Sequence, residues 1–175
     1  NWNSCVNLRE VQSLQRLSHQ NLVPILEVIR ERDDGLYFVF EYMSGGSLYD
    51  ITKKCCENKQ RISNGNIKTF VRQILQGLSY IHSEGFIHRD IKPENVLLSE
   101  RGGHVVLIDF GTAKDLINTD LNGPEFVGTP DFMSPEAVKE FKKGGNGCDF
   151  TADLWSFGVV LYQLYSGALP FESQR

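Results

Sequence analysis

A long helical stripe in the middle of the chain is the feature that most restricts how it can fold. Apolar residues recur at intervals of three and four over residues 67–81, and the pattern stops before Gly85. This spacing predicts an amphipathic helix that buries one face. Short apolar runs at 87–88, 96–98 and 104–108 follow, and they predict short strands separated by polar loops.

The segments before this helix predict a second helix and a hairpin. Apolar positions at helical spacing over 7–17 predict an amphipathic helix. Extended runs at 23–30 and 36–41 flank Asp33-Asp34-Gly35, which is typical turn chemistry, so the pair predicts a β-hairpin. The Gly- and Ser-rich stretch 44–47 is expected to be a flexible connector.

The last third of the chain predicts a long loop and one helix. Residues 116–131 show no sustained period, and a loop of that length is usually functional or disordered. Glycines over 144–147 predict a second flexible connector. Residues 152–165 are apolar on nearly all sides, which predicts a buried helix.

Composition excludes several classes of protein. The chain has 41% hydrophobic and 23% charged residues, which is ordinary for a globular domain. Because 18 Lys and Arg stand against 22 Asp and Glu, the basic surface of a nucleic-acid-binding protein is missing. No apolar run approaches the roughly 20 residues of a membrane span. Cysteines at 5, 55, 56 and 148 lack metal-site or redox spacing and predict free thiols in the cytoplasm or nucleus.

The residues that carry chemistry lie outside the periodic elements. His88–Asn95 follows the central helix, and Asp109-Phe110-Gly111 follows a predicted strand, where a carboxylate can hold a metal ion. Asp90 with Lys92 offers a proton acceptor beside a cation, and Asn95 offers a neutral oxygen ligand. Together these groups supply what phosphoryl transfer needs, which is charge neutralisation and an oriented hydroxyl. Taken singly, each motif is more often a turn or surface charge.

The order of these motifs resembles the catalytic-loop, D-F-G and A-P-E signatures of the eukaryotic protein kinases, over essentially the whole chain. The resemblance implies a two-lobed α+β fold that is incomplete here. Residues 1–43 would form part of the small N-lobe, and 44–175 would form the C-lobe from helix αD to just after αF. The start at Asn1 instead of Met also indicates that the chain begins within a longer protein.

The resemblance implies roles for the catalytic residues, with ATP and Mg²⁺ as cofactors and proteins as substrates. Asp90 would be the catalytic base, and Lys92 would contact the γ-phosphate. Asn95 and Asp109 would hold Mg²⁺. Glu10, in helix αC, would pair with the ATP-binding lysine.

Further residues would bind the nucleotide. Backbone groups of Glu41 and Met43, in the hinge between the lobes, would meet the adenine, with Phe40 as gatekeeper. Ser47 stands where many kinases place an acid that contacts the ribose. The resemblance also implies that Leu97 would contact the nucleotide. Four residues match the hydrophobic spine that links the two lobes in this family; these are Leu14, Ile25, His88 and Phe110. Asp153 matches the aspartate that braces the catalytic loop. For Glu10, Leu14 and Ile25 the alternative is plain helix surface and core.

In this family the activation segment runs from the D-F-G motif to the A-P-E motif, and here it favours Ser/Thr specificity. Thr129 would touch Asp90 and Lys92, as in Ser/Thr kinases, and Lys92 itself differs from the tyrosine-kinase pattern. Arg89 precedes Asp90, and in the family an arginine at that position normally pairs with an activation-loop phosphate. Glu125 stands where phosphoinositide-dependent kinases carry an activating serine. We hypothesise that Glu125 supplies a permanent, weaker negative charge, the alternative being a solvated loop carboxylate.

The two halves of the chain resemble different kinase branches. The first half is similar to the male-germ-cell-associated kinases, and the second to phosphoinositide-dependent protein kinase and its AGC and calmodulin-kinase relatives. The Gly-rich loop and its following lysine are not among these 175 residues, so the isolated chain, expected to be a monomer, should phosphorylate little. Two other interpretations are a pseudokinase or scaffold acting by protein binding, and an unrelated nucleotide- or metal-binding protein.

Overall fold

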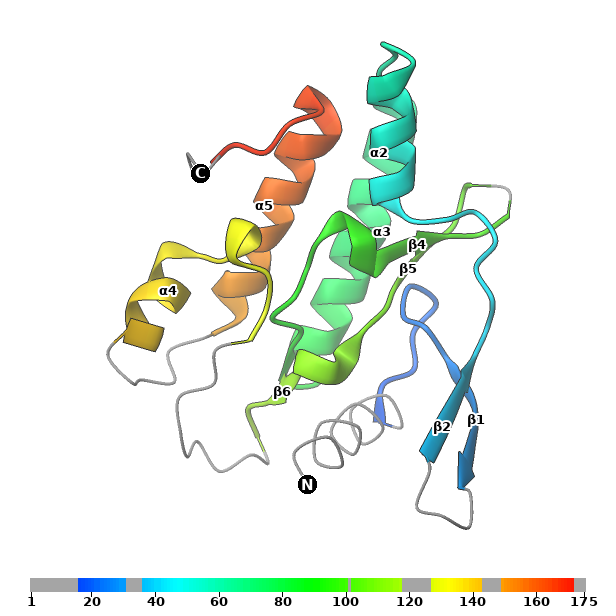
Figure 1. Ribbon diagram of the computed structural model, residues 1–175. Coiled ribbons are helices and arrows are strands. Elements are labelled where there is room, and N and C mark those ends of the chain that lie inside the picture. The colour runs from blue at the N-terminus through cyan, green and yellow to red at the C-terminus, as the bar shows by residue number, and fades with distance from the viewer. Residues whose placement is uncertain (1–15, 31–35, 101, 118–126, 143–148, 172–175) are drawn as a thin grey trace.

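The computed structural model of the chain describes residues 16–30, 36–100, 102–117, 127–142 and 149–171 (Figure 1). Four helices lie in these ranges: α2 Leu48–Glu57, α3 Asn64–Ser83, α4 Pro135–Lys142 and α5 Phe150–Ser166. The strands are β1 Ile25–Arg30, β2 Leu36–Phe40, β3 Phe86–Ile87, β4 Val96–Leu98, β5 Val105–Leu107 and β6 Lys114–Asp115. Three short 3-10 turns are η1 Pro93–Asn95, η2 Phe110–Thr112 and η3 Pro130–Phe132.

Helix α3 is the predicted central helix, and its stripe is confirmed. It begins after Ser63, whose hydroxyl accepts a hydrogen bond from the backbone N–H of Asn66 at 3.2 Å. Its buried apolar positions recur at three and four residues and form much of the core; they are Ile67, Phe70, Ile74, Leu78 and Ile81. The helix thereby supports the strands and loops that follow it.

The strands form three two-stranded antiparallel sheets, β1–β2, β3–β6 and β4–β5. The predicted hairpin is confirmed as β1–β2, which projects from the helical part of the molecule (Figure 1). In the β4–β5 pair, Val96 lies opposite Leu107. This register brings Asn95 next to Ile108, whose backbone N–H donates to the Asn95 carbonyl at 3.0 Å. Two polar loops therefore meet at one end of this sheet.

The stretch 44–47 differs from the flexible connector expected for it, because β4 holds it in place. The backbone N–H of Gly45 donates to the Leu98 carbonyl at 3.0 Å, and a Cβ at Gly45 would lie 2.2 Å from the Ser99 carbonyl oxygen. Ser47 then caps α2 in a reciprocal capping box with Asp50. A glycine at 45 therefore serves close backbone packing and not mobility.

Helix α5 confirms the predicted helix over 152–165 but not its burial on all sides. One face is buried, comprising Asp153, Ser156, Val159, Val160 and Leu164. The opposite face exposes large apolar side chains, with Leu154 at 49% and Tyr162 at 50%. Among the described residues, α3, β3 and η3 are the elements that pack closely on α5, so only one face is covered.

Several predicted segments fall partly or wholly outside the described residues. These are the helix over 7–17 except its last two residues, most of the loop 116–131, and the connector 144–147. Cys55 and Cys56 are free thiols, as predicted, whereas Cys5 and Cys148 lie outside the described ranges. In the part of the chain that the structure describes, no helix combines the length and apolar character needed to cross a membrane.

Candidate active site

Asp90 lies at the centre of a compact set of polar side chains. Its Oδ2 accepts hydrogen bonds from Lys92 Nζ at 2.7 Å and from Asn95 Nδ2 at 3.1 Å. Its Oδ1 accepts a hydrogen bond from Thr129 Oγ1 at 2.7 Å. Lys92 Nζ also donates to Thr129 Oγ1 at 2.9 Å. The structure thus brings together four residues that the sequence predicted would act together, although Thr129 is 39 positions away from Asp90.

Burial and hydrogen bonding act on the Asp90 carboxyl in opposite directions. Asp90 is only 6% exposed, and this burial alone would raise its pKa, because it penalises the charged form. The hydrogen bonds from Lys92 and Thr129, together with the charge of Lys92, outweigh burial and hold the pKa below the usual range. At neutral pH Asp90 is therefore an ionised carboxylate, which can accept a proton but is a weak base.

Asp153 holds the loop that carries Asp90. Its fully buried carboxylate accepts from the backbone N–H of His88 at 2.9 Å and of Arg89 at 2.8 Å. The His82 ring nitrogen lies 2.8 Å from the same carboxylate. Arg89 has a positive φ of 69°, a conformation that costs energy for a residue with a side chain. Asp153 therefore braces the strained backbone at the start of the loop that carries Asp90.

The loop carrying Thr129 meets the same strained residue. Gly128 has φ of +103°, and a Cβ there would lie 2.5 Å from the Arg89 carbonyl oxygen. Glycine is therefore required for Thr129 to reach Asp90. Arg89 Nε donates to the Thr112 carbonyl at 2.6 Å, and Thr112 Oγ1 donates to the His88 carbonyl at 3.0 Å.

Asn95 and Asp109 offer oxygen atoms at the end of the β4–β5 sheet. The Asn95 amide nitrogen donates to the Asp90 carbonyl at 2.8 Å and to its carboxylate, so the amide orientation leaves Oδ1 as an open acceptor. Asp109 is exposed with φ of 64°. Within the described ranges its Oδ1 accepts one hydrogen bond, a long one of 3.4 Å from the Gly111 N–H. A carboxylate and an amide oxygen are suitable ligands for Mg²⁺, so the chemistry of these two side chains suits such an ion.

The predicted nucleotide-binding residues lie along the hinge and β4. Glu41 is exposed and Met43 is half-buried against the core, directly after β2. Leu97 is half-buried in β4 and forms an isolated bridge with Ser47. Ser47 is 8% exposed, and its hydroxyl both donates to the Asp50 carboxylate at 2.7 Å and accepts from the Asp50 N–H. The helix cap therefore already uses the Ser47 hydroxyl.

Of the predicted spine residues, His88 and Phe110 are fully buried and in contact. Their ring centroids lie 4.9 Å apart, and a His88 ring nitrogen lies 3.0 Å from the Ile108 carbonyl oxygen. Ile25 packs, half-buried, against the main core. Leu14, Glu10 and Glu125 lie outside the described residues.

Three positioning residues had no clear signal in the sequence. His82 lies at the end of α3 and contacts Asp153, and Thr112 links Arg89 to the backbone of His88. Ser156 donates from α5 to the Phe132 carbonyl at 2.7 Å. The one signal in the sequence for Ser156, and more weakly for His82, is that each is a polar residue within a largely apolar helix.

Replacing Thr129 by valine tests how the Asp90 carboxylate is held. The change removes one hydrogen bond to the charged form, so we expect the pKa of Asp90 to rise. The lowered pKa of Asp90 also stabilises the folded protein. This stabilisation is fully present above roughly pH 4, the pKa of the unfolded chain, and it is lost as the pH falls through the pKa of the folded state. The acid limb of the pH–activity profile of the full-length protein should therefore move to higher pH in Thr129→Val. An unmoved limb would show that Thr129 does not act on Asp90.

The motifs that the structure brings together at Asp90 are those through which the sequence resembles the protein kinases. A family model described as the protein kinase domain matches residues 2–175, so the chain belongs to this family. The α+β fold class and the kinase resemblance predicted from the sequence are thereby confirmed.

Three relatives illustrate the similarity. The chain is 37% identical over 174 residues to Serine/threonine-protein kinase pkn3 of Myxococcus xanthus, and 39% over 166 residues to Serine/threonine-protein kinase MAK of Mus musculus. It is 36% identical over 166 residues to Death-associated protein kinase 2 of Homo sapiens. These alignments cover 94%, 94% and 93% of the chain but only 30%, 25% and 42% of the relatives' length. Differently named kinases thus match nearly the whole chain at similar identity.

Proposed function

We propose that the protein containing this chain transfers the γ-phosphate of ATP to serine or threonine hydroxyls of protein substrates. The observation that carries this proposal is the ionised Asp90 carboxylate, held by Lys92 and Thr129 beside Asn95. The Ser/Thr specificity is supported by the names of the similar kinases. In this proposal residues 1–43 belong to the small lobe and 44–175 to the helical lobe.

Asp90 would orient the attacking hydroxyl. An ionised carboxylate accepts the hydroxyl proton as a hydrogen bond and thereby aims the oxygen at phosphorus. As the new O–P bond forms and the bond to the ADP oxygen breaks, the proton passes to Asp90. A weak base suffices for this step, because the transition state of phosphoryl transfer is loose and little negative charge needs to be created on the hydroxyl early.

Lys92 would hold the moving phosphoryl group. Its ammonium has three N–H donors, and two of them bond Asp90 and Thr129. The third remains for a phosphate oxygen, where a positive charge stabilises the transition state. Asn95 and Asp109 would hold Mg²⁺, which when bound supplies neutralisation of the phosphate charges.

The nucleotide itself would lie against the hinge. Glu41 and Met43 would present backbone groups to the adenine, and Leu97 would supply an apolar surface for its ring. The Ser47 hydroxyl would accept a hydrogen bond from the ribose through its second lone pair, because its donor and its other lone pair are used by Asp50. Asp50, an exposed carboxylate one turn along, is the alternative.

The activity would be regulated by charge in the activation segment and by the position of Asp109, as in the family. Arg89 would respond to negative charge in the activation segment, and Phe110 would set the position of Asp109 through its contact with His88. Glu125 would supply a permanent negative charge in the activation segment. Glu10 would pair with the ATP-binding lysine.

Substitution of Asp109 by alanine tests the proposed metal site. In the full-length protein we expect Mg²⁺ to strengthen ATP binding for the wild type but not for Asp109→Ala, and phosphate transfer to fall roughly 100-fold or more. Titration calorimetry with ATP, with and without Mg²⁺, measures the first effect. Asp131→Ala, at another exposed aspartate, should behave as wild type. Unchanged Mg²⁺ dependence in Asp109→Ala would refute the assignment.

A further inference from the structure

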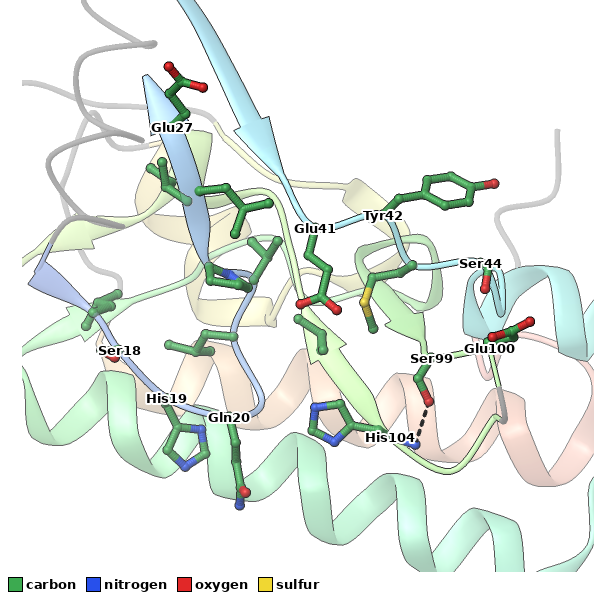
Figure 2. A pocket seen from close by; sticks show the side chains of 18 of the residues that line it. Ser18, His19, Gln20, Glu27, Glu41, Tyr42, Ser44, Ser99, Glu100 and His104 are labelled. Carbon is green, nitrogen blue, oxygen red and sulfur yellow. Dashed lines mark hydrogen bonds between the residues drawn. The ribbon is translucent and has the colours of Figure 1, made fainter. Parts of the chain in front are cut away.

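A large pocket lies behind the hinge, away from Asp90 and the side chains that surround it. Its volume is about 1230 Å³, and its walls come from residues 17–24, strand β1, the hinge residues 41–44 and the β4–β5 connection (Figure 2). We call it the rear pocket. None of the five residues grouped around the proposed phosphoryl-transfer centre lines it; these are Asp90, Lys92, Asn95, Asp109 and Thr129. The rear pocket therefore lies apart from the phosphoryl-transfer centre, and it shares Glu41 and Met43 with the hinge.

The inner surface of the rear pocket is apolar. Leu22, Val23 and Val106 line it and are 3%, 6% and 4% exposed, so they form a fixed floor that belongs to the core. Leu26 lines the pocket from β1 and is 61% exposed. Such a surface can accept an aliphatic side chain from another molecule and gain free energy from its burial.

The rim of the rear pocket carries negative charge. Glu27, Glu41 and Glu100 line it and are exposed, and no lysine or arginine of the described residues joins them. In Figure 2 the Glu41 side chain extends into the pocket, and Glu27 and Glu100 lie on opposite sides of it. Within the described ranges, none of the three carboxylates forms an ion pair or hydrogen bond. Two histidines, His19 and His104, also line the pocket.

Two observations indicate what kind of molecule would bind there. The described residues contain no group of three or more His, Cys, Asp or Glu side chains that could hold a metal ion, so the carboxylates are too dispersed for that purpose. The volume of about 1230 Å³ also exceeds the roughly 300–1,000 Å³ of a typical small-molecule pocket. Dispersed carboxylates around an apolar floor instead match an extended segment with several side chains.

We propose that the rear pocket binds an extended basic segment of a partner protein. Arginine or lysine side chains of that segment pair with Glu27, Glu41 and Glu100, and an intervening aliphatic side chain packs on the floor. The long stems of basic residues also cover apolar surface while their charges reach the rim. Charge complementarity of this kind selects basic over acidic partners and speeds association. The proposal does not depend on the phosphoryl-transfer centre around Asp90. Glu27 and Glu100 belong neither to that centre nor to the hinge, and Glu41 would contribute its side chain here, whereas the nucleotide proposal uses its backbone.

Fluorescence anisotropy of the full-length protein with a labelled nonapeptide of four arginines, three leucines and two glycines tests the proposal. We expect saturable binding that weakens at high salt, and no binding of the matched peptide with glutamates in place of the arginines. The double variant Glu27→Gln/Glu100→Gln should bind the basic peptide about five-fold more weakly, since each exposed ion pair contributes modestly. Leu26→Ser should also weaken binding, and because Leu26 is exposed its substitution should leave the fold intact.

Matched control variants separate the rear pocket from general charge effects. Glu57→Gln/Glu84→Gln removes two exposed carboxylates at the ends of α2 and α3, and Ile29→Ser removes an exposed apolar side chain of β1 that does not line the pocket. Both controls should bind the peptide as wild type does. The proposal is overturned if the basic peptide does not bind, if the acidic peptide binds as tightly, or if the control pair weakens binding as much as the pocket pair.

Discussion

Asp90→Asn is expected to lower phosphate transfer by the full-length protein about 1,000-fold, within the range for loss of a general base. Asparagine keeps the size of the side chain and an oxygen that can accept from Thr129 or Lys92. It lacks the negative charge and cannot take the hydroxyl proton. ATP affinity should stay unchanged, because the nucleotide contacts proposed for the hinge do not involve this carboxylate.

Transfer of labelled phosphate under saturating ATP measures the first effect, and equilibrium ATP binding measures the second. Glu84→Gln, which neutralises an exposed carboxylate at the end of α3, is the matched control and should retain full activity. Full activity in Asp90→Asn would reject its assignment as the base. Loss of both activity and ATP binding would show instead that Asp90 acts by holding the nucleotide site together.

Asp153→Ala is expected to cause the largest loss of stability. The substitution leaves the backbone N–H groups of His88 and Arg89 without an acceptor, in a place where Asp153 is fully buried. Each unsatisfied buried donor costs about 1–3 kcal/mol, so we expect the free energy of unfolding to fall by about 3–5 kcal/mol. That is a large share of the 5–15 kcal/mol typical of a domain.

Denaturant unfolding of the full-length protein, followed through the transition of its kinase domain, measures this loss. Hydrogen exchange at the amides of His88 and Arg89 should accelerate. Asp149→Ala removes an exposed helix cap from the same helix α5 and should cost only about 1 kcal/mol. Equal effects of the two substitutions would contradict the bracing role of Asp153.

Much of the fold follows from local sequence patterns. The period of residues 67–81 predicts α3, and turn chemistry predicts the β1–β2 hairpin, because both depend on interactions between near neighbours. The polar residues of the site could also be listed in advance, since Asp90 and Lys92 are two positions apart. That Thr129 closes this group across 39 positions was predictable only through the family resemblance.

Features that depend on contacts between residues far apart in the sequence could not be predicted from the sequence alone. Gly45 looks like a flexible glycine until the Ser99 carbonyl is found against it. The buried link in which Asn21 Nδ2 donates to Gln73 Oε1 at 3.1 Å joins residues 52 positions apart, and no local pattern marks either residue. The apolar sequence of α5 predicts burial, but how many of its faces are covered depends on which elements pack against it.

The most direct test of the central claim is phosphoamino-acid analysis after incubation of the full-length protein with ATP labelled in its γ-phosphate. With Mg²⁺ and a mixed protein substrate, label should appear on serine and threonine, and chelation of the Mg²⁺ should abolish it. ATP binding without any transfer would contradict the claim and favour a pseudokinase. Label on tyrosine alone would contradict the Ser/Thr assignment.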